Sequence, residues 1–351
     1  MRRVRKGKVF AIFHPGLMMV LLLVMTPPML IRWGFDHVPA YGNNEAVSSV
    51  LDNKSFVNLR LLRTLTGHSG TVKSLAFTAD SKILVSGGSD NEGIIRFWRI
   101  QSGRNIGNIG RAHQTAVEAV VITPDGKTLI SGSSDNLINL WDLKSLKFNR
   151  SLVGHRSHVM ALAVSPDNKV LVSGGLDGIR LWDLQQQRPL ATLVRFDNSI
   201  YSLAISPDGQ ILASGDAKGV IKLWDLASGK LIRSLVAHED RVTDLDFTAN
   251  GQILVSASRD RTIKLWNTQN GARYRTLTGH NNWVNAIALH PNGQTLASGG
   301  KDGIKLWNLT TGELQQTLTA HDDWVSTLAF SRDGKTLASG SFDQKIKLWG
   351  E

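Results

Sequence analysis

The chain has 351 residues, a formal net charge of +11 and no cysteine. The missing cysteines exclude disulfides, thiolate zinc sites and cysteine nucleophiles. The first 40 residues supply +5 of the charge, and no basic run follows them. Proteins that bind nucleic acid usually concentrate basic residues on one face, so the charge pattern does not favour a nucleic-acid partner.

The first 40 residues have the pattern of a targeting segment. A basic head, MRRVRKGK, precedes residues 9–31, which contain no Asp, Glu, Lys or Arg. This order is typical of an export signal, and the uncharged stretch is also long enough to span a bilayer as a helix. We expect residues 1–40 to be a cleaved signal peptide or an N-terminal membrane anchor, and residues 41–57 to be a tether. Either form places the rest of the chain outside the cytoplasm.

From residue 58 the sequence repeats with a period of 41 to 43 residues. Each unit contains four short β-rich runs separated by turn residues such as SPDG (206–209), a pattern typical of an antiparallel meander. Both faces of such a sheet are apolar, and copies packed around an axis bury both of them. The sequence therefore predicts an all-β, seven-bladed β-propeller over residues 58–351. One tryptophan marks each unit: Trp98, Trp141, Trp182, Trp224, Trp266, Trp307 and Trp349.

The phase of the repeat predicts how the ring closes. The seventh unit ends at IKLWGE (346–351), which matches a third strand, and residues 58–68 match a fourth strand. We expect the N-terminal strand to complete the last blade.

Six units also contain a Gly-His or Ala-His pair near their start, and several end in Trp-Asp. Over residues 58–351 these motifs resemble the WD40 repeat family. The resemblance implies a structural tetrad of His, Ser, Asp and Trp in each blade, in which the buried carboxylate accepts hydrogen bonds that it needs. The tetrads are His68, Ser86, Asp90, Trp98; His113, Ser131, Asp135, Trp141; His155, Ser173, Asp177, Trp182; His238, Ser256, Asp260, Trp266; His280, Ser298, Asp302, Trp307; and His321, Ser339, Asp343, Trp349.

Ser, His and Asp are also the components of a nucleophilic triad. An enzyme needs one such set beside an oxyanion hole, whereas this chain has six near-copies, which favours a structural role. The histidines recur once per blade, too far apart to share a metal ion. We therefore expect no catalytic residue, no metal and no cofactor.

Two blades depart from the repeat. In the fourth, Arg195 and Phe196 replace the Gly-His pair and Lys218 replaces the tetrad Asp, while Ser214 and Trp224 remain. This is either drift, with Asp197 or Asp216 compensating, or a divergent functional blade.

In the fifth blade, Asp244 and Asp246 lie on one face of the first strand, where other blades have small residues. They either pair with Arg241 or Arg259, or point into the axial channel.

The sixth and seventh units contain HNNWV and HDDWV. Trp283 and Trp324 then fall in loops that WD40 proteins place on the top face, with Phe342 nearby. Neighbouring aromatics at one rim resemble an interface hot spot; the alternative is that they only cover the tetrads. A mixed-charge surface would surround them: Arg156, His158, Arg241, Arg259, Lys301 and Asp323.

A Lys or Arg stands two residues before the Trp in six units, and Asn139 replaces it in the second. We interpret these cations as solvated stems beside the indole rather than as a phosphate-binding ring.

These patterns favour a monomeric, non-catalytic scaffold that binds protein partners through its top face. We expect it to be secreted or periplasmic, or held at the membrane by an uncleaved N-terminal segment. One alternative is a small-molecule or metal-binding propeller enzyme that uses the axial channel. The other is a binder of nucleic acid or acidic polymers.

Overall fold

The computed structural model describes residues 58–89, 93–195 and 198–351. The signal or anchor predicted for residues 1–40 and the tether predicted for residues 41–57 lie outside the described residues. Every regular element in the described ranges is a β-strand. A search of these ranges finds no helix with the length and apolar character needed to cross a membrane.

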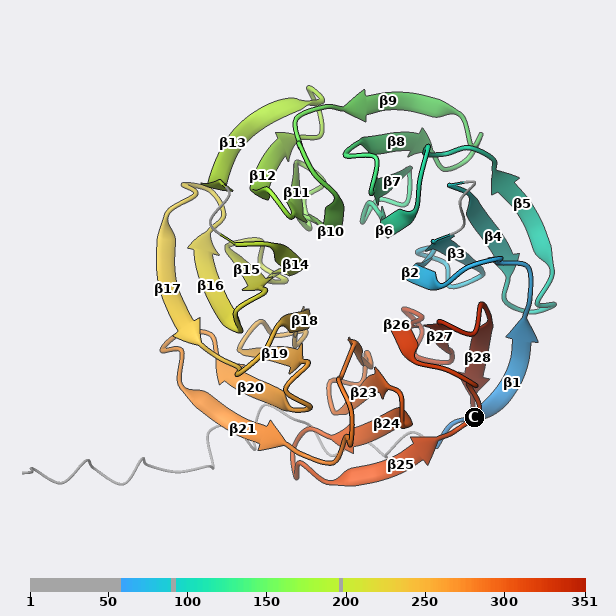
Figure 1. The fold of residues 1–351 in the computed structure, drawn as a ribbon, viewed down its shortest axis with the longest axis vertical. Helices are drawn as coiled ribbons and strands as arrows, with labels where there is room; N and C mark the ends of the chain where they lie inside the picture. The colour runs from blue at the N-terminus through green and yellow to red at the C-terminus, as the bar shows by residue number, and fades with distance from the viewer. Residues whose placement is uncertain (1–57, 90–92, 196–197) are drawn as a thin grey trace, which may run out of the picture. The chain divides into compact units, whose positions relative to one another are not determined.

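Seven four-stranded antiparallel sheets form the blades of a ring around a central opening (Figure 1). Blades 1 to 3 consist of β2 (Val72–Phe77), β3 (Ile83–Gly88), β4 (Ile95–Arg99) and β5 (Asn105–Ile109); β6 (Val117–Ile122), β7 (Thr128–Ser133), β8 (Ile138–Asp142) and β9 (Phe148–Leu152); and β10 (Val159–Val164), β11 (Val170–Gly175), β12 (Gly178–Asp183) and β13 (Arg188–Arg195). Blades 4 to 6 consist of β14 (Ile200–Ile205), β15 (Ile211–Asp216), β16 (Val220–Asp225) and β17 (Leu231–Val236); β18 (Val242–Phe247), β19 (Ile253–Ser258), β20 (Ile263–Asn267) and β21 (Arg273–Leu277); and β22 (Ala286–Leu289), β23 (Thr295–Gly300), β24 (Gly303–Asn308) and β25 (Leu314–Leu318). Blade 7 consists of β26 (Val325–Phe330), β27 (Leu337–Ser341), β28 (Ile346–Gly350) and β1 (Arg60–Leu65).

The N-terminal strand closes the ring, as the repeat phase predicts. β1 is the outermost strand of blade 7 and pairs antiparallel with β28, with Leu61 opposite Trp349 and Leu65 opposite Ile346. Figure 1 shows β1 lying beside β28, where the two ends of the propeller meet. The predicted seven-bladed propeller and its closure by the N-terminal strand are therefore confirmed.

The core is divided among the seven interfaces between adjacent blades. Each interface holds one hydrophobic cluster, and each cluster contains one of the seven repeat tryptophans. Between blades 5 and 6, for example, Trp307 packs with Val255 and Leu265 of the preceding blade. All seven indoles are at most 6% exposed. Since an aromatic side chain of this size dominates the apolar area it buries, the repeated Trp fixes how each blade lies against the one before it.

Small residues on the second strands let the blades approach closely. A Cβ built on Gly215 would lie 2.5 Å from Val242 of the next blade, and one on Gly340 would lie 2.6 Å from Val72 across the closing interface. Glycine at such positions is required by the close approach of a neighbouring element. This packing accounts for the Ser-Gly dipeptides that recur along the chain.

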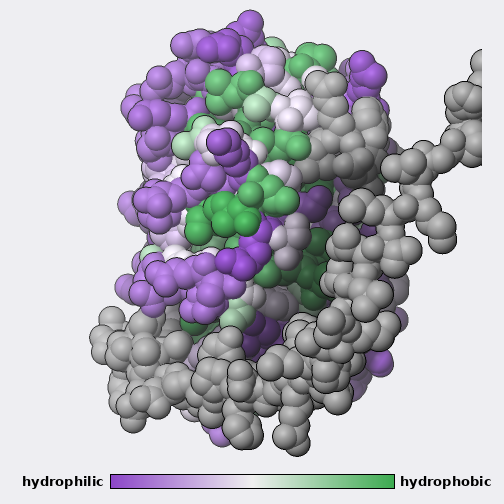
Figure 2. All heavy atoms as spheres, turned by 90° about the vertical axis from the view of Figure 1, so that its left-hand side faces the viewer, coloured by the Kyte–Doolittle hydropathy of each residue, from purple (hydrophilic) through white to green (hydrophobic). Residues whose placement is uncertain are grey.

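The outer edge of the ring is less apolar than the interfaces between blades, but it is not uniformly polar. Large apolar side chains on β13 and β17 of blades 3 and 4 are exposed: Leu190, Leu231, Ile232 and Val236. Figure 2, which views the left-hand side of Figure 1, shows hydrophobic residues gathered between hydrophilic ones on this side of the ring.

Candidate functional site: the channel mouth on the top face

The hydrogen-bonded tetrads have the same geometry in five blades. In all seven blades the Trp indole N–H donates to the Ser hydroxyl of the second strand at 2.8 to 3.0 Å. In six blades the His Nε2 lies 2.6 to 2.8 Å from the same hydroxyl. In blades 2, 3, 5, 6 and 7 the His Nδ1 lies 2.6 to 3.0 Å from the Asp carboxylate. The loop before the first strand is thus tied to the second and third strands.

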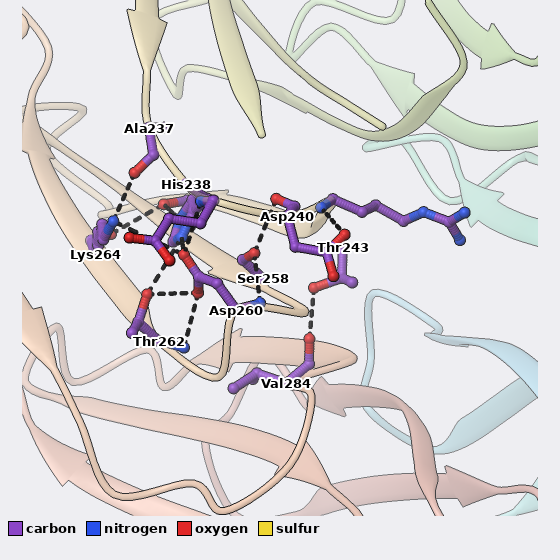
Figure 3. Close-up of polar contacts among 12 residues, drawn as sticks. Ala237, His238, Asp240, Thr243, Ser258, Asp260, Thr262, Lys264 and Val284 are labelled. Carbon is purple, nitrogen blue, oxygen red and sulfur yellow. Dashed lines mark hydrogen bonds and ion pairs between the residues drawn. The ribbon is translucent and has the colours of Figure 1, made fainter. Parts of the chain in front are cut away.

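Proton positions follow from this geometry. The hydrogen bonds from His238 and Thr262 outweigh the effect of burial and hold the pKa of Asp260 far below its ordinary value, so Asp260 is ionised and can only accept. Burial lowers the pKa of His238 more than Asp260 raises it. Neutral His238 therefore donates from Nδ1 to Asp260 (Figure 3) and accepts at Nε2 from Ser256.

The tetrad serines are inaccessible to a substrate. Each of the seven Ser side chains is at most 2% exposed, and each hydroxyl accepts the indole N–H of its own blade. A nucleophile must reach the reacting carbon, and these hydroxyls are enclosed. This geometry suits a structural role.

The interpretation of the cations two residues before the repeat Trp as solvated stems is wrong for most of the six blades that have such a cation. Lys305 is 8% exposed, with its Nζ 3.4 Å from Asp302. Arg180 lies 3.0 Å from Asp177. The Lys264 ammonium donates to the Ala237 carbonyl at 2.7 Å (Figure 3). A buried Asp draws a cation toward it because an unpaired buried charge is costly.

The tetrad of blade 1 is described only in part, and blade 4 departs from the tetrad. In blade 1, His68, Ser86 and Trp98 are linked, while Asp90 lies outside the described residues. In blade 4, Phe196 also lies outside them; Arg195 ends β13, and Lys218 is exposed.

A different carboxylate organises the top loops of blade 4. Asp216 is 3% exposed, accepts from the Asn198 amide at 2.9 Å, and accepts from the backbone N–H groups of Lys218 and Val220. Asp216 thus joins the same two loops that the His–Asp pair joins elsewhere.

Asp244 lines the central channel, which was one of the two expectations; the other expectation, an ion pair with Arg241 or Arg259, is wrong for both carboxyls within the described residues. Asp244 accepts from the backbone N–H of Ile287 at 2.9 Å, and Asp246 accepts from that of Leu289 at 3.2 Å. Both acceptors therefore tie β18 of blade 5 to β22 of blade 6. Burial is the main cause that raises the pKa of Asp244 to about 7 and of Asp246 to about 6, and the charge of Asp246 adds to the shift of Asp244.

The mouth of the central channel is lined by a position that does not repeat. The residue after the first buried Val or Ile of each blade, in the inner strand or directly before it, differs in every blade, and all seven line one recess of about 160 Å³: Lys73, Glu118, Met160, Tyr201, Thr243, Asn285 and Ser326. Arg241 and Phe342 complete the recess. The sequence reasoning missed this ring, although one non-repeating position in an otherwise repeated strand was the signal for it.

Several of these side chains also bind the neighbouring blade. Thr243 donates to the Val284 carbonyl at 2.6 Å (Figure 3), and Asn285 donates to the Val325 carbonyl at 3.0 Å. Lys73 lies 3.7 Å from Glu118. These contacts join blades 1 and 2, blades 5 and 6, and blades 6 and 7 at the mouth, which stabilises its shape.

An aromatic shelf adjoins the mouth. The rings of Trp283 and Trp324 lie 5.1 Å apart, and Trp283 is 41% exposed. The Lys301 ammonium lies 5.6 Å from the Trp324 ring centroid. The backbone N–H of Phe342 donates to the Trp324 carbonyl at 2.9 Å, and the Phe342 ring is 43% exposed.

The remaining predicted surface residues lie apart from this shelf or serve their own loop. Arg156 and His158, in the loop before β10 of blade 3, are exposed. The backbone N–H of Arg156 donates to Asp177 at 2.8 Å. Asp323 accepts from the backbone N–H of Trp324 at 2.8 Å, so it holds the turn that presents that indole. In the described ranges no group of three or more His, Asp or Glu residues is arranged to hold a metal ion.

The geometry defines a closed propeller of sequence repeats whose top face combines a polar channel mouth with an aromatic shelf. Comparison with protein families matches the WD40 family, described as WD domain, G-beta repeat, seven times: at residues 59–99, 105–142, 146–183, 187–225, 229–267, 271–308 and 312–350. A search of curated proteins gave no match. The chain belongs to the WD40 repeat family. WD40 propellers typically are non-enzymatic scaffolds that bind other proteins.

Ser256→Ala tests the tetrad against an internal control. The substitution leaves both the Trp266 indole N–H and His238 Nε2 without their shared partner, and each unsatisfied buried group costs about 1–3 kcal/mol. Ser214→Ala in blade 4 removes the partner of the Trp224 indole, and both serines also lose a contact with a strand carbonyl, but only Ser256 has a histidine partner. Urea denaturation should show a loss in the free energy of unfolding that is about 1–2 kcal/mol larger for Ser256→Ala. Equal losses would mean that the histidine link adds no stability.

Asp244→Asn with Asp246→Asn tests the ties between blades 5 and 6. Both carboxyls bind protons more readily in the folded chain, so their contribution to stability is complete below about pH 4. It is lost as the pH rises through about 6 and about 7. Relative to wild type, the double variant should gain on the order of 1–3 kcal/mol of unfolding free energy between pH 5 and pH 8.

The measurement is urea denaturation at a series of pH values, with Asp208→Asn as the control. The hydrogen bond from Ser206 lowers the pKa of Asp208, so its effect appears only in acid, below the window of the test. A flat difference between the double variant and wild type across this window would contradict the protonation of Asp244 and Asp246.

Proposed function

We propose that this protein is a non-catalytic scaffold that binds protein partners through its top face, at the channel mouth and the aromatic shelf. The observation that carries the proposal is the tilted pair Trp283 and Trp324. Their side chains project from two successive blades, and Trp283 remains 41% exposed although every repeat Trp is buried. Exposed aromatics beside charged groups are the composition of protein-interface hot spots.

The rigid frame supports this use of the surface. The loops that present the two indoles are fixed by the tetrads of blades 6 and 7, in which His280 and His321 hold Asp302 and Asp343 at 2.7 and 2.8 Å. A surface that is ordered before binding loses little conformational entropy when a partner arrives. The enclosed tetrad serines give no support to a hydrolytic alternative.

Trp283→Ala with Trp324→Ala tests the shelf. Affinity capture from the native host with tagged full-length protein, quantified by mass spectrometry, should recover specific partners with wild type and lose them with the double variant. For a purified partner the dissociation constant should rise at least about tenfold, since hot-spot aromatics contribute about 2 kcal/mol or more.

The matched control is Ile232→Ala with Val236→Ala, which removes two exposed apolar side chains from β17 on the outer edge. It should leave partner recovery unchanged. Loss of partners from the control, with recovery intact in the tryptophan variant, would move the interface to the outer edge.

We further propose that the protein works outside the cytoplasm, either exported or tethered to the membrane. The support is the basic head and the uncharged residues 9–31 of the sequence. Cell fractionation and intact mass of the expressed protein test this. A soluble form beginning near Tyr41 would mark a cleaved signal, and an intact Met1 in the membrane fraction would mark an anchor. A cytosolic protein would contradict both.

A further inference from the structure

Two arginines lie next to each other where the channel mouth meets the aromatic shelf. Arg241 belongs to the loop before β18 and Arg259 to the loop after β19, and the Arg259 backbone N–H donates to the Arg241 carbonyl at 3.1 Å. The Arg241 guanidinium carbon lies 3.6 Å from the ring centroid of Tyr201. That of Arg259 lies 4.2 Å from the ring centroid of Trp283. Each planar guanidinium is therefore held by an aromatic ring, an arrangement that suits arginine better than lysine because the guanidinium can stack on the ring.

Neither guanidinium has a carboxylate partner within the described part of the chain, where the ion pairs of less than 4 Å involve other residues. The nearby Asp240 instead accepts from the backbone N–H of Arg241 at 2.6 Å. The Nε of Arg259 is buried without a hydrogen-bond partner. Buried polar groups are rarely left unsatisfied unless something else meets them.

The two positive charges also oppose each other. Burial, followed by the charge of Arg241, lowers the pKa of Arg259, and the charge of Asp240 offsets part of this effect. Close like charges raise the energy of the free protein, and an oxyanion that contacts both guanidinium groups would remove that repulsion. Arginine binds such groups through two parallel N–H donors.

We propose that Arg241 and Arg259 form an oxyanion site for an acidic side chain of a protein partner, whose apolar neighbours lie on the Trp283–Trp324 shelf. This inference rests on the proposed function and names the chemistry of the partner. A carboxylate and a phosphorylated side chain share the required geometry. The acid of the mouth, Glu118, is already paired with Lys73, so the positive charge of the arginine pair is not balanced within the mouth.

Selection of short random peptides displayed on phage, against immobilised full-length protein, supplies the probe. Enriched peptides should contain Asp or Glu next to apolar or aromatic residues. Their affinity is then measured by fluorescence anisotropy, with each peptide made in three forms: acidic, with the acid replaced by its amide, and with phosphoserine at the same position.

The decisive measurement combines these peptides with Arg241→Gln/Arg259→Gln. On wild type, the change from acid to amide should weaken binding at least about tenfold, because it leaves desolvated guanidinium groups unpaired. On the double variant the same change should have less than about a twofold effect, since the groups that recognise the charge are gone. Tighter binding of the phosphoserine form to wild type alone would identify phosphate as the preferred oxyanion.

Two controls keep the result specific. Arg104→Gln/Arg150→Gln makes the same change of net charge at two exposed positions, Arg104 directly before β5 and Arg150 in β9. This variant should preserve the preference for the acidic peptide. Arg259→Lys retains the charge but not the paired donors, so it should lose most of that preference while its thermal unfolding stays close to wild type.

The outcomes separate the two proposals. Peptides that bind wild type, require Trp283 and show no difference between acid and amide would overturn the oxyanion site and leave the scaffold function standing. Failure to enrich any peptide, together with unchanged partner recovery in the Trp283→Ala/Trp324→Ala variant, would overturn both. Binding of a short single-stranded oligonucleotide that depends on the arginines, with no peptide preference, would also overturn the inference.

Discussion

The structure depends on seven buried indoles, each packed into the interface with the preceding blade and each with its N–H bound to a serine hydroxyl. A buried Trp N–H usually has a hydrogen-bond partner, because an unsatisfied buried donor is costly. The serine on the second strand of each blade is that partner. The same interface requires small residues such as Gly215 opposite Val242. The buried indole, its serine partner and the small residue recur at each interface, and together they account for the repeated motifs of the sequence.

Blade 4 shows which part of this network is indispensable. It has lost the tetrad His and Asp but keeps Ser214 bound to Trp224 at 2.9 Å, which is the part that the blade interface needs. The link between the top loops is made there by Asp216 and Asn198. The His–Asp pair is thus one of two ways to join the loops, whereas the chain offers no substitute for the Ser–Trp pair in any of its seven blades.

The sequence was sufficient to predict the blades, their number and the closing strand, because the strand pattern and the Trp spacing are local and recur seven times. It could not predict contacts between blades. The partners of Asp244 and Asp246 are backbone N–H groups 43 residues away, and a backbone group leaves no mark in the sequence. The burial of Lys305 was missed for a different reason: its partner Asp302 is only three residues away in the same blade, but the sequence does not show that this carboxylate is largely buried. Trp283 and Trp324 stood out in the sequence, but their contacts with Arg259 and Lys301 depend on how loops of different strands meet.

The difference between positions that repeat in every blade and positions that vary explains why the channel mouth is a reasonable place for recognition. The buried residues that pack the blades together recur with little change in every blade, whereas the residue after the first buried Val or Ile of each blade lines the channel and differs in all seven blades. Three of these variable side chains still fasten neighbouring blades through backbone carbonyls, so the rim stays ordered while its chemistry changes. Arg241 and Arg259 extend from this ordered rim and are held against aromatic rings. A partner that met them would therefore not have to order long, mobile side chains, and more of its contact energy would remain as affinity.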